Sequence, residues 1–409
     1  GRAETSGPWP SPHKQFTTML EDLATELASL EAQALRRRLQ VVEEVLPGGK
    51  VRVGGRVLLN LSSNDYLGLA QDPRLLAAAR AAAARWGVGA GASRLVVGHL
   101  ALHAEVEAKL AAFKGTDAAV IFSTGYMANL GVISALMGPG DLIFGDKLNH
   151  ASLYDGIKLA GASLKRFSHR DVKQLEKMLR ETPPGKKKLI VTDSVFSVDG
   201  DLAPLAELAA LKERYGAGLM VDEAHATGVL GPGGAGLAEA LGLTAKIEVH
   251  MGTFSKALGS LGGYVAGDRR LIDYLHNRAR SLIYSTALPP PVLGAIGGAL
   301  DLVSQEPQRR AYLLEEAGKF RRELARAGLD TLGSETQIVP VLVGDNARTL
   351  EFAGALRDQG LMAVALRPPT VPPGKSRVRF SLSAAHSPED LAWARERIIR
   401  TARGMGLAS

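Results

Sequence analysis

The sequence predicts an α/β fold: a large domain with a mostly parallel sheet covered by helices on both faces, then a smaller C-terminal α+β domain. Short apolar runs alternate with helical patterns, as expected when each strand is followed by a crossover helix. The runs are residues 118–123, 142–145, 164–167, 189–195, 219–221 and 247–251. The helical patterns are 127–136, 152–159, 172–179 and 205–215. From about Pro289 the helices lengthen and the strands shorten, which marks the smaller domain.

The N-terminal region has three expected parts. Residues 1–15 are rich in Gly, Pro and Ser and predict a disordered tail. Leucines at helical spacing predict a helix from Thr17 that continues as a charged helix to Arg38, and Gly54 and Gly55 predict a hairpin. The resulting boundaries are 16–60 for the helix and hairpin, 61–288 for the large domain and 289–409 for the small domain.

Composition excludes several classes of function. The 409 residues include no cysteine, so disulfides, thiolate metal sites and a cysteine nucleophile are excluded, and we expect no metal site. The net charge of +7 is scattered in short groups without interleaved aromatic residues, which argues against nucleic-acid binding. No apolar run reaches the roughly 18 residues needed to span a bilayer. We therefore expect a soluble, cytoplasmic protein that is bound to neither nucleic acid nor membrane.

The strongest chemical signal is Lys256 in the stretch TFSKALGS. It follows the apolar run 247–251, so burial can remove the charge of its amine and let it attack a carbonyl. Asp222 ends another apolar run, at the sheet edge where open parallel sheets bind ligands. An aspartate there can keep a pyridinium nitrogen protonated while a lysine forms the Schiff base, which predicts pyridoxal 5′-phosphate (PLP) as cofactor. His225, three residues on, could reach the phenolic oxygen of that ring.

Several other residues are candidates for contacts with this cofactor, but some of them could instead have a purely structural role. Gly125 and Tyr126 begin a helix directly after a strand, a place for the phosphate, although a capped helix is about as good an explanation. Thr253 offers a hydroxyl for the same phosphate. Ser197 could donate to the phenolic oxygen. His150 precedes a helix and could simply cap it.

Several motifs occur in a fixed order from about residue 20 to the C-terminus: SSNDYLGL, LNHASL, VFSVDGD, VDEAH, TFSKALG, LIYST, RPPTVP and SAAH. In this order they identify the chain as similar to the α-oxoamine synthase family, fold-type I PLP enzymes that condense an amino acid with an acyl thioester and release carbon dioxide. The resemblance implies that His150 lies flat on the cofactor ring and that Arg36 and Asn64 contact substrate. It also implies that Thr370 is a second substrate contact.

Arg367 stands before a rigid proline run in RPPTVP, which favours recognition of a carboxylate by a fixed guanidinium. By resemblance, Tyr284, Ser285 and Thr286 reach the active site of a neighbouring subunit, which implies a homodimer.

Within the family, LIYST and RPPTVP are most similar to the member that joins L-alanine to a pimeloyl thioester in biotin biosynthesis. The alternatives are relatives that use glycine with an acetyl or succinyl thioester and, from another class, a non-catalytic binding protein or a Rossmann-type dehydrogenase. Whether coenzyme A or a carrier protein delivers the acyl group stays open. Glu223, Ala226 and Tyr126 depart from common family residues but keep the chemical type.

Overall fold

The computed structural model describes residues 12–408, and its centre is a seven-stranded sheet. Its strands, in spatial order, are β4 (Ala118–Phe122), β10 (Gly263–Gly267), β9 (Val249–Thr253), β8 (Gly218–Asp222), β7 (Lys188–Asp193), β5 (Leu142–Asp146) and β6 (Ser163–Phe167). Strands β9, β8, β7, β5 and β6 run parallel to one another, whereas β10 is antiparallel to both β4 and β9. The predicted mostly parallel sheet is confirmed, and β10 is the strand that sequence periodicity did not predict.

Helices cover both faces of this sheet because its strands, apart from the edge strand β6, are apolar on both sides. Alternate residues of one strand enter different cores: Phe144 packs in one and Ile143 in the other. One core includes side chains of α3 (Ala101–Lys114), α6 (Val172–Arg180), α7 (Leu205–Tyr215), α8 (Leu237–Ala240) and α11 (Pro290–Gln305). The other includes side chains of α4 (Gly125–Leu136), α5 (Ala151–Ala160), α9 (Arg269–Arg278) and α10 (Arg280–Ile283). The α2 helix (Pro73–Trp86) packs against α11, beyond the sheet.

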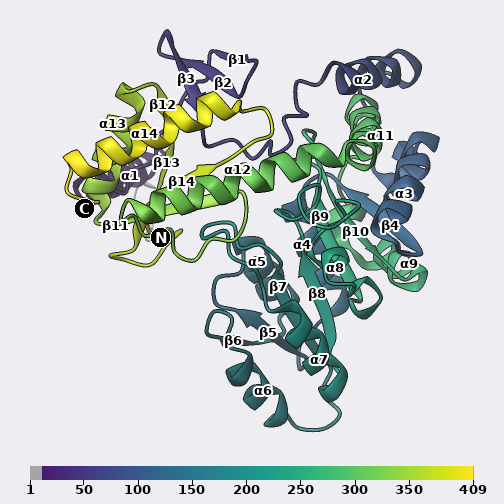
Figure 1. Cartoon of the computed structure of the whole chain (residues 1–409). Coiled ribbons are helices and arrows are strands. Elements are labelled where there is room, and N and C mark those ends of the chain that lie inside the picture. The colour runs from purple at the N-terminus through teal and green to yellow at the C-terminus, as the bar shows by residue number, and fades with distance from the viewer. Residues whose placement is uncertain (1–11, 409) are drawn as a thin grey trace, which may run out of the picture.

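The C-terminal part contributes strands to two smaller sheets (Figure 1). Strands β11 (Ile338–Gly344), β14 (Ser376–Ser381) and β13 (Val364–Leu366) form one, with α12 (Pro307–Arg326), α13 (Asn346–Asp358) and α14 (Pro388–Gly404) beside it. The other joins β1 (Glu44–Leu46), β2 (Lys50–Val53) and β3 (Arg56–Asn60) to β12 (Leu361–Met362). The predicted hairpin thus pairs with a strand some 300 residues later, where Leu59 lies opposite Leu361.

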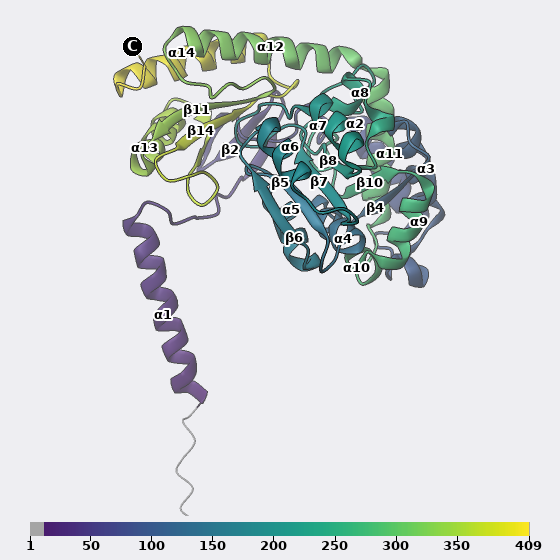
Figure 2. The same ribbon diagram turned by 90° about the horizontal axis from the view of Figure 1, so that it is seen from below.

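The N-terminal helix α1 (Pro12–Ala32) projects away from the rest of the chain (Figure 2). The predicted continuation to Arg38 is wrong: Ala34 has a φ of 53°, and the Leu30 carbonyl accepts from both Leu35 and Arg36, which closes the helix. Residues 12–15, assigned to the tail from sequence, are helical, and residues 1–11 of that tail lie outside the described residues. Among residues 12–408, no helix is long and apolar enough to cross a membrane.

Candidate active site

A cavity of about 210 Å³ opens where β8 and β9 end and α4 begins. This edge of the sheet is where open α/β folds place ligands. Seven predicted site residues line it: Gly125, Tyr126, His150, Asp222, His225, Thr253 and Lys256. The topology therefore brings together side chains that lie up to 131 positions apart in the sequence, counted from 125 to 256.

Lys256 carries the amine of the cavity, and its environment favours the uncharged form. Burial lowers its pKa, while the carboxylates Asp222 and Asp193 partly oppose that shift. Lys114, by contrast, is fully buried, and its amine is 2.5 Å from a carboxylate oxygen of Glu223. Burial is the largest single influence and lowers the pKa of Lys114, but the charges of Glu223 and Tyr264 and the hydrogen bonds to both together outweigh it, so the net shift is upward. Of these two lysines, only Lys256 is adapted to act as a nucleophile or base.

Asp222 is fixed by two hydrogen bonds at the end of β8. Its Oδ1 accepts from the Ala224 backbone at 2.9 Å and its Oδ2 accepts from Asn129 Nδ2 at 2.9 Å. The same Asn129 nitrogen donates to Ser152 Oγ at 2.9 Å, and Ser152 Oγ is 2.7 Å from His150 Nδ1. A chain of polar groups thus joins His150 to Asp222. Sequence reasoning missed Asn129 and Ser152.

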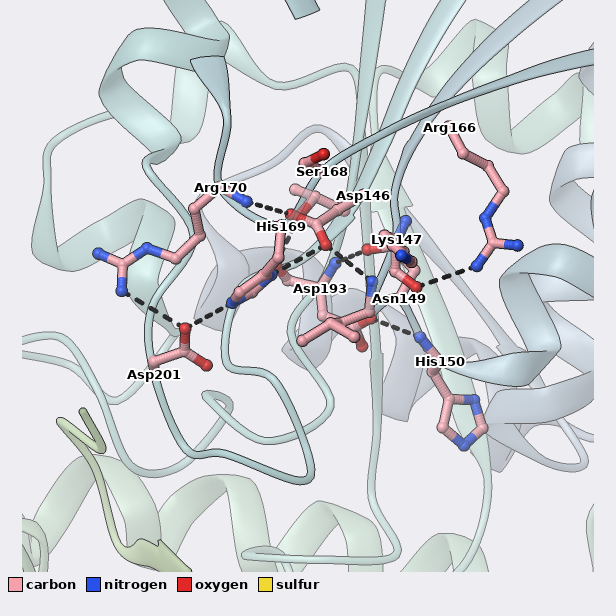
Figure 3. Close-up of polar contacts among 12 residues, drawn as sticks. Asp146, Lys147, Asn149, His150, Arg166, Ser168, His169, Arg170, Asp193 and Asp201 are labelled. Atoms are coloured by element: carbon pink, nitrogen blue, oxygen red, sulfur yellow. Dashed lines mark hydrogen bonds and ion pairs between the residues drawn. The ribbon is translucent and has the colours of Figure 1, made fainter. Parts of the chain in front are cut away.

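Asp193 ends β7 directly opposite Asp222 in the register of the sheet. Burial, and then the charge of Asp222, raise the pKa of Asp193 well above its usual range. Its Oδ2 accepts from the His150 backbone at 2.7 Å, as Figure 3 shows. Asp193 therefore positions the His150 backbone beside the cavity.

His225 is buried and belongs to a second set of polar side chains that contact one another. Its Nδ1 is 2.7 Å from the hydroxyl of Tyr66, which also lies 3.1 Å from Asn64 Oδ1. Burial and then the nearby charge of Lys256 lower the pKa of His225, so the ring is neutral. Nε2 is then the nitrogen that can contact a ligand. Tyr66 stands in the SSNDYLGL motif but was not predicted as a site residue.

The first turn of α4 supplies backbone donors beside the cavity. Thr124 caps this helix by accepting from Met127 N at 3.1 Å, and Gly125 follows. A side chain at Gly263 on β10 would bring its Cβ within 2.5 Å of Gly125 Cα, so glycine is required for this close approach. Thr253 Oγ1 and Ser255 Oγ, 2.7 Å apart, are hydroxyls on the cavity wall.

The groups that line this cavity fit PLP. The helix N-terminus and the two hydroxyls suit a phosphate, Asp222 suits a basic ring nitrogen, and Lys256 suits an aldehyde. Among the described residues, no cluster of His, Asp or Glu is arranged to hold a metal ion.

Other predicted residues lie outside the lining of this cavity. Arg367 Nη1 donates to the Ala34 carbonyl, and Arg37 Nη2 donates to Thr370 Oγ1 at 3.1 Å. Arg36, Arg367 and Thr370 therefore gather where the segment after α1 meets the RPPTVP loop. Ser197 contacts Arg379 through its carbonyl. Tyr284 is 71% exposed, and Ser285 and Thr286 line a separate small hollow.

Arg379 on β14 was missed by sequence reasoning. Its Nη1 donates to the Ser197 carbonyl at 2.7 Å and its Nη2 donates to Asn64 Oδ1 at 3.3 Å. Its positive charge contributes to the lowered pKa values of Lys256 and His225, after the larger effect of burial. The available signal was an arginine inside the apolar run VRFSL, between the buried Val378 and Phe380.

A model of the family "Aminotransferase class I and II" matches residues 56–398. The chain belongs to this family. It is 53% identical over 367 residues to an 8-amino-7-oxononanoate synthase of Anaeromyxobacter dehalogenans, covering 90% of this chain and 92% of that protein. A serine palmitoyltransferase from S. paucimobilis, solved with PLP bound, is similar with a TM-score of 0.91 and 33% identity, over 95% of this chain and 99% of the other.

An 8-amino-7-oxononanoate synthase from Francisella tularensis has a TM-score of 0.75 and 29% identity, over 85% of this chain and 99% of the other. Together with the family match, these likenesses confirm the fold-type I class, the PLP cofactor and the transferase class. They also confirm the predicted resemblance to enzymes that make 8-amino-7-oxononanoate for biotin.

Proposed function

We propose that this enzyme condenses L-alanine with a pimeloyl thioester to give 8-amino-7-oxononanoate, carbon dioxide and the free thiol. The observation that carries the proposal is the identity of about half of the residues, along nearly the whole chain, with such a synthase. The lowered pKa of Lys256, which lines a cavity suited to PLP together with Asp222, supports the same chemistry.

The residues of the chain divide the work as follows. PLP, when bound, supplies an electron sink that makes the α proton of an attached amino acid acidic. Lys256 Nζ would hold the cofactor and is the base placed to take a proton from the substrate. Asp222 would hold the ring nitrogen and His150 would cover the ring, while His225 Nε2 and the Ser197 hydroxyl would hold the ring oxygen. The first turn of α4, with Gly125, Tyr126 and Thr253, would hold the phosphate.

We propose Arg379 as the group that binds the alanine carboxylate, in place of the sequence-based choice of Arg367. The charge of Arg379 acts on Lys256 and His225, and its guanidinium contacts Asn64, a predicted substrate residue. Arg367, Arg36 and Thr370 are then available for the acyl substrate, which carries a distal carboxylate and arrives on a phosphate-bearing thiol. A fixed cationic group suits both anions.

Replacing each arginine by methionine separates the two assignments. We expect Arg379→Met to raise the KM for alanine by about ten-fold or more, because a charged hydrogen-bond pair is worth about 1.5–3 kcal/mol. Arg367→Met should instead raise the KM for the thioester. Steady-state kinetics with each substrate varied in turn measures both values. If only Arg367→Met raised the KM for alanine, the sequence-based assignment of Arg367 would be restored.

We also propose that the enzyme acts as a homodimer with the active site at its interface. The segment 94–98 exposes Leu95, Val96 and Val97 by 58%, 72% and 73%, and Tyr284 nearby is 71% exposed. The Ser93–Thr286 bridge joins the two exposed stretches. An apolar surface of this kind is typical of a covered interface. A second copy is the natural cover because LIYST, by resemblance, reaches a neighbouring subunit.

A substrate panel tests the function. We expect kcat/KM, measured by carbon dioxide release, to be highest for alanine with a pimeloyl thioester, offered both on coenzyme A and on a carrier protein. Glycine should be disfavoured by about 10- to 200-fold, the range for one methyl group in a pocket. A preference for glycine with acetyl or succinyl thioester would reject the proposed substrates. Release from none of these pairs would favour a non-catalytic role.

A further inference from the structure

His169 lies outside the cavity, in the turn between β6 and α6, and both of its ring nitrogens contact buried carboxylates. Nδ1 is 2.9 Å from Asp146 Oδ1 and Nε2 is 2.7 Å from Asp201 Oδ2. Figure 3 shows the ring lying between the two aspartates. Because an ionised carboxylate only accepts, both nitrogens must donate, and the ring must carry a proton on each.

The charges around His169 favour this protonated form. It faces Asp146 on β5, and Asp201 and Asp199 in the turn after β7; Arg170 Nη1 lies 3.4 Å from both Asp201 and Glu335. The second oxygen of Asp201 is buried and has no hydrogen-bond partner among the described residues. Burial opposes the ring charge, but the hydrogen bonds to Asp146 and Asp201 outweigh it and raise the pKa of His169 to about 9.

Asp146 also forms hydrogen bonds within the loop that carries His150. Its Oδ1 also accepts from the Leu148 backbone at 2.8 Å, and its carbonyl accepts from the Asn149 backbone at 3.0 Å. Asn149 in turn donates to the Val191 carbonyl at 2.8 Å. The conformation of residues 146–150, and with it the place of His150 at the cavity, depends on the Asp146 carboxylate.

Asp201 fixes the turn that carries Ser197. Its carbonyl accepts from the Phe196 backbone at 3.0 Å, and the Phe196 ring meets His169 edge-on with centroids 4.4 Å apart. His169 thus connects the loop after β5, which carries the lining residue His150, to the turn after β7, which carries Ser197 and follows the lining residue Asp193.

We propose that His169, as an imidazolium bridging Asp146 and Asp201, is a positioning residue that holds the His150 loop against the Ser197 turn and thereby sets the affinity for PLP. This rests on the proposed function in taking the cavity as the PLP site. We call the Asp146–His169–Asp201 bridge the brace. When the ring loses a proton, one nitrogen presents a lone pair to a carboxylate, and the brace opens. A group whose pKa is raised on folding stabilises fully below its usual value of about 6.5, and its contribution is lost as the pH rises through about 9.

The test compares wild type with Asp201→Asn between pH 7 and pH 10, following the melting temperature of cofactor-free protein and the Kd for PLP. In the variant a neutral His169 can donate to Asp146 and accept from the new amide, so the brace no longer needs the second proton. At pH 10 about one tenth of wild-type rings stay charged, so we expect the wild-type Kd to rise about ten-fold relative to the variant, with a matching loss of melting temperature. Titration of Lys256 affects both proteins equally and cancels in the ratio.

Equal Kd profiles for the two proteins would overturn the proposal, even if their melting profiles differ, because the brace would then be structural without positioning the site. If Asp201→Asn does not fold, His169→Gln replaces it: the Kd should be raised already at pH 7, and its rise from pH 7 to pH 10 should be about ten-fold smaller than that of wild type. An equal rise in the two proteins would contradict the proposal. Absence of PLP binding at pH 7 in wild type would reject the proposed function itself, and so is distinct from either result.

Discussion

Replacing Lys256 by alanine is expected to lower kcat by about 10³-fold or more, because the variant loses both the nucleophile that holds PLP and the base that takes the α proton. The change should not unfold the protein, since the amine lies at the cavity wall among Asp222 and Asp193. PLP should still bind weakly through Asp222 and the first turn of α4. Carbon dioxide release measures the rate, and gel filtration with absorbance measures retained cofactor.

Lys246→Ala is the matched control for this experiment. Lys246 is half-exposed, ten positions before Lys256 in the chain, and pairs with Glu213 at 2.9 Å on the surface. We expect that variant to keep wild-type kinetics, because an exposed ion pair contributes little. A Lys256→Ala enzyme within ten-fold of wild type would show that another group performs both roles.

Asp222→Asn is expected to have the second largest effect, a loss of about 10²-fold or more in the exchange of the α proton of alanine with solvent. The substitution keeps the size of the side chain and an oxygen for Asn129 or Ala224, so the packing is retained. A neutral amide, however, cannot keep a ring nitrogen protonated, and the α proton becomes less acidic. Proton exchange followed by NMR isolates this step from the later condensation.

The control for Asp222→Asn is Asp345→Asn. Asp345 caps α13 by accepting from Arg348 N at 2.9 Å, and asparagine caps helices about as well as aspartate. We expect no change in exchange rate there. Near-normal exchange in Asp222→Asn would remove Asp222 from its assigned role and point to Asp193, the neighbouring carboxylate, as the ring partner.

The parts of the site that sequence predicted are those with a local signal. Lys256 and Asp222 each follow a buried strand, and parallel strands end at the same edge of a sheet, so their meeting at one cavity follows from the alternating pattern. His150 and Gly125 stand at or beside helix starts, where capping chemistry is visible in a few residues of sequence.

The missed residues depend on contacts that no local pattern encodes. Asn129 lies inside a helix, where an asparagine is unremarkable until its amide is seen between Asp222 and Ser152. Arg379 reaches Ser197 across 182 positions of chain, and β12 pairs with β3 across about 300. The end of α1 at Ala32 was missed because the left-handed residue is an alanine, where glycine is the usual signal.

Reduction with borohydride followed by digestion and mass spectrometry tests the central claim most directly, because it locates PLP on the chain. Two lysines compete for this assignment: Lys114 is buried and held charged by Glu223, whereas Lys256 is half-buried at the cavity wall and its pKa is lowered. We predict the added mass of reduced cofactor on the peptide that contains Lys256. Cofactor on the Lys114 peptide, or on no lysine at all, would contradict the account.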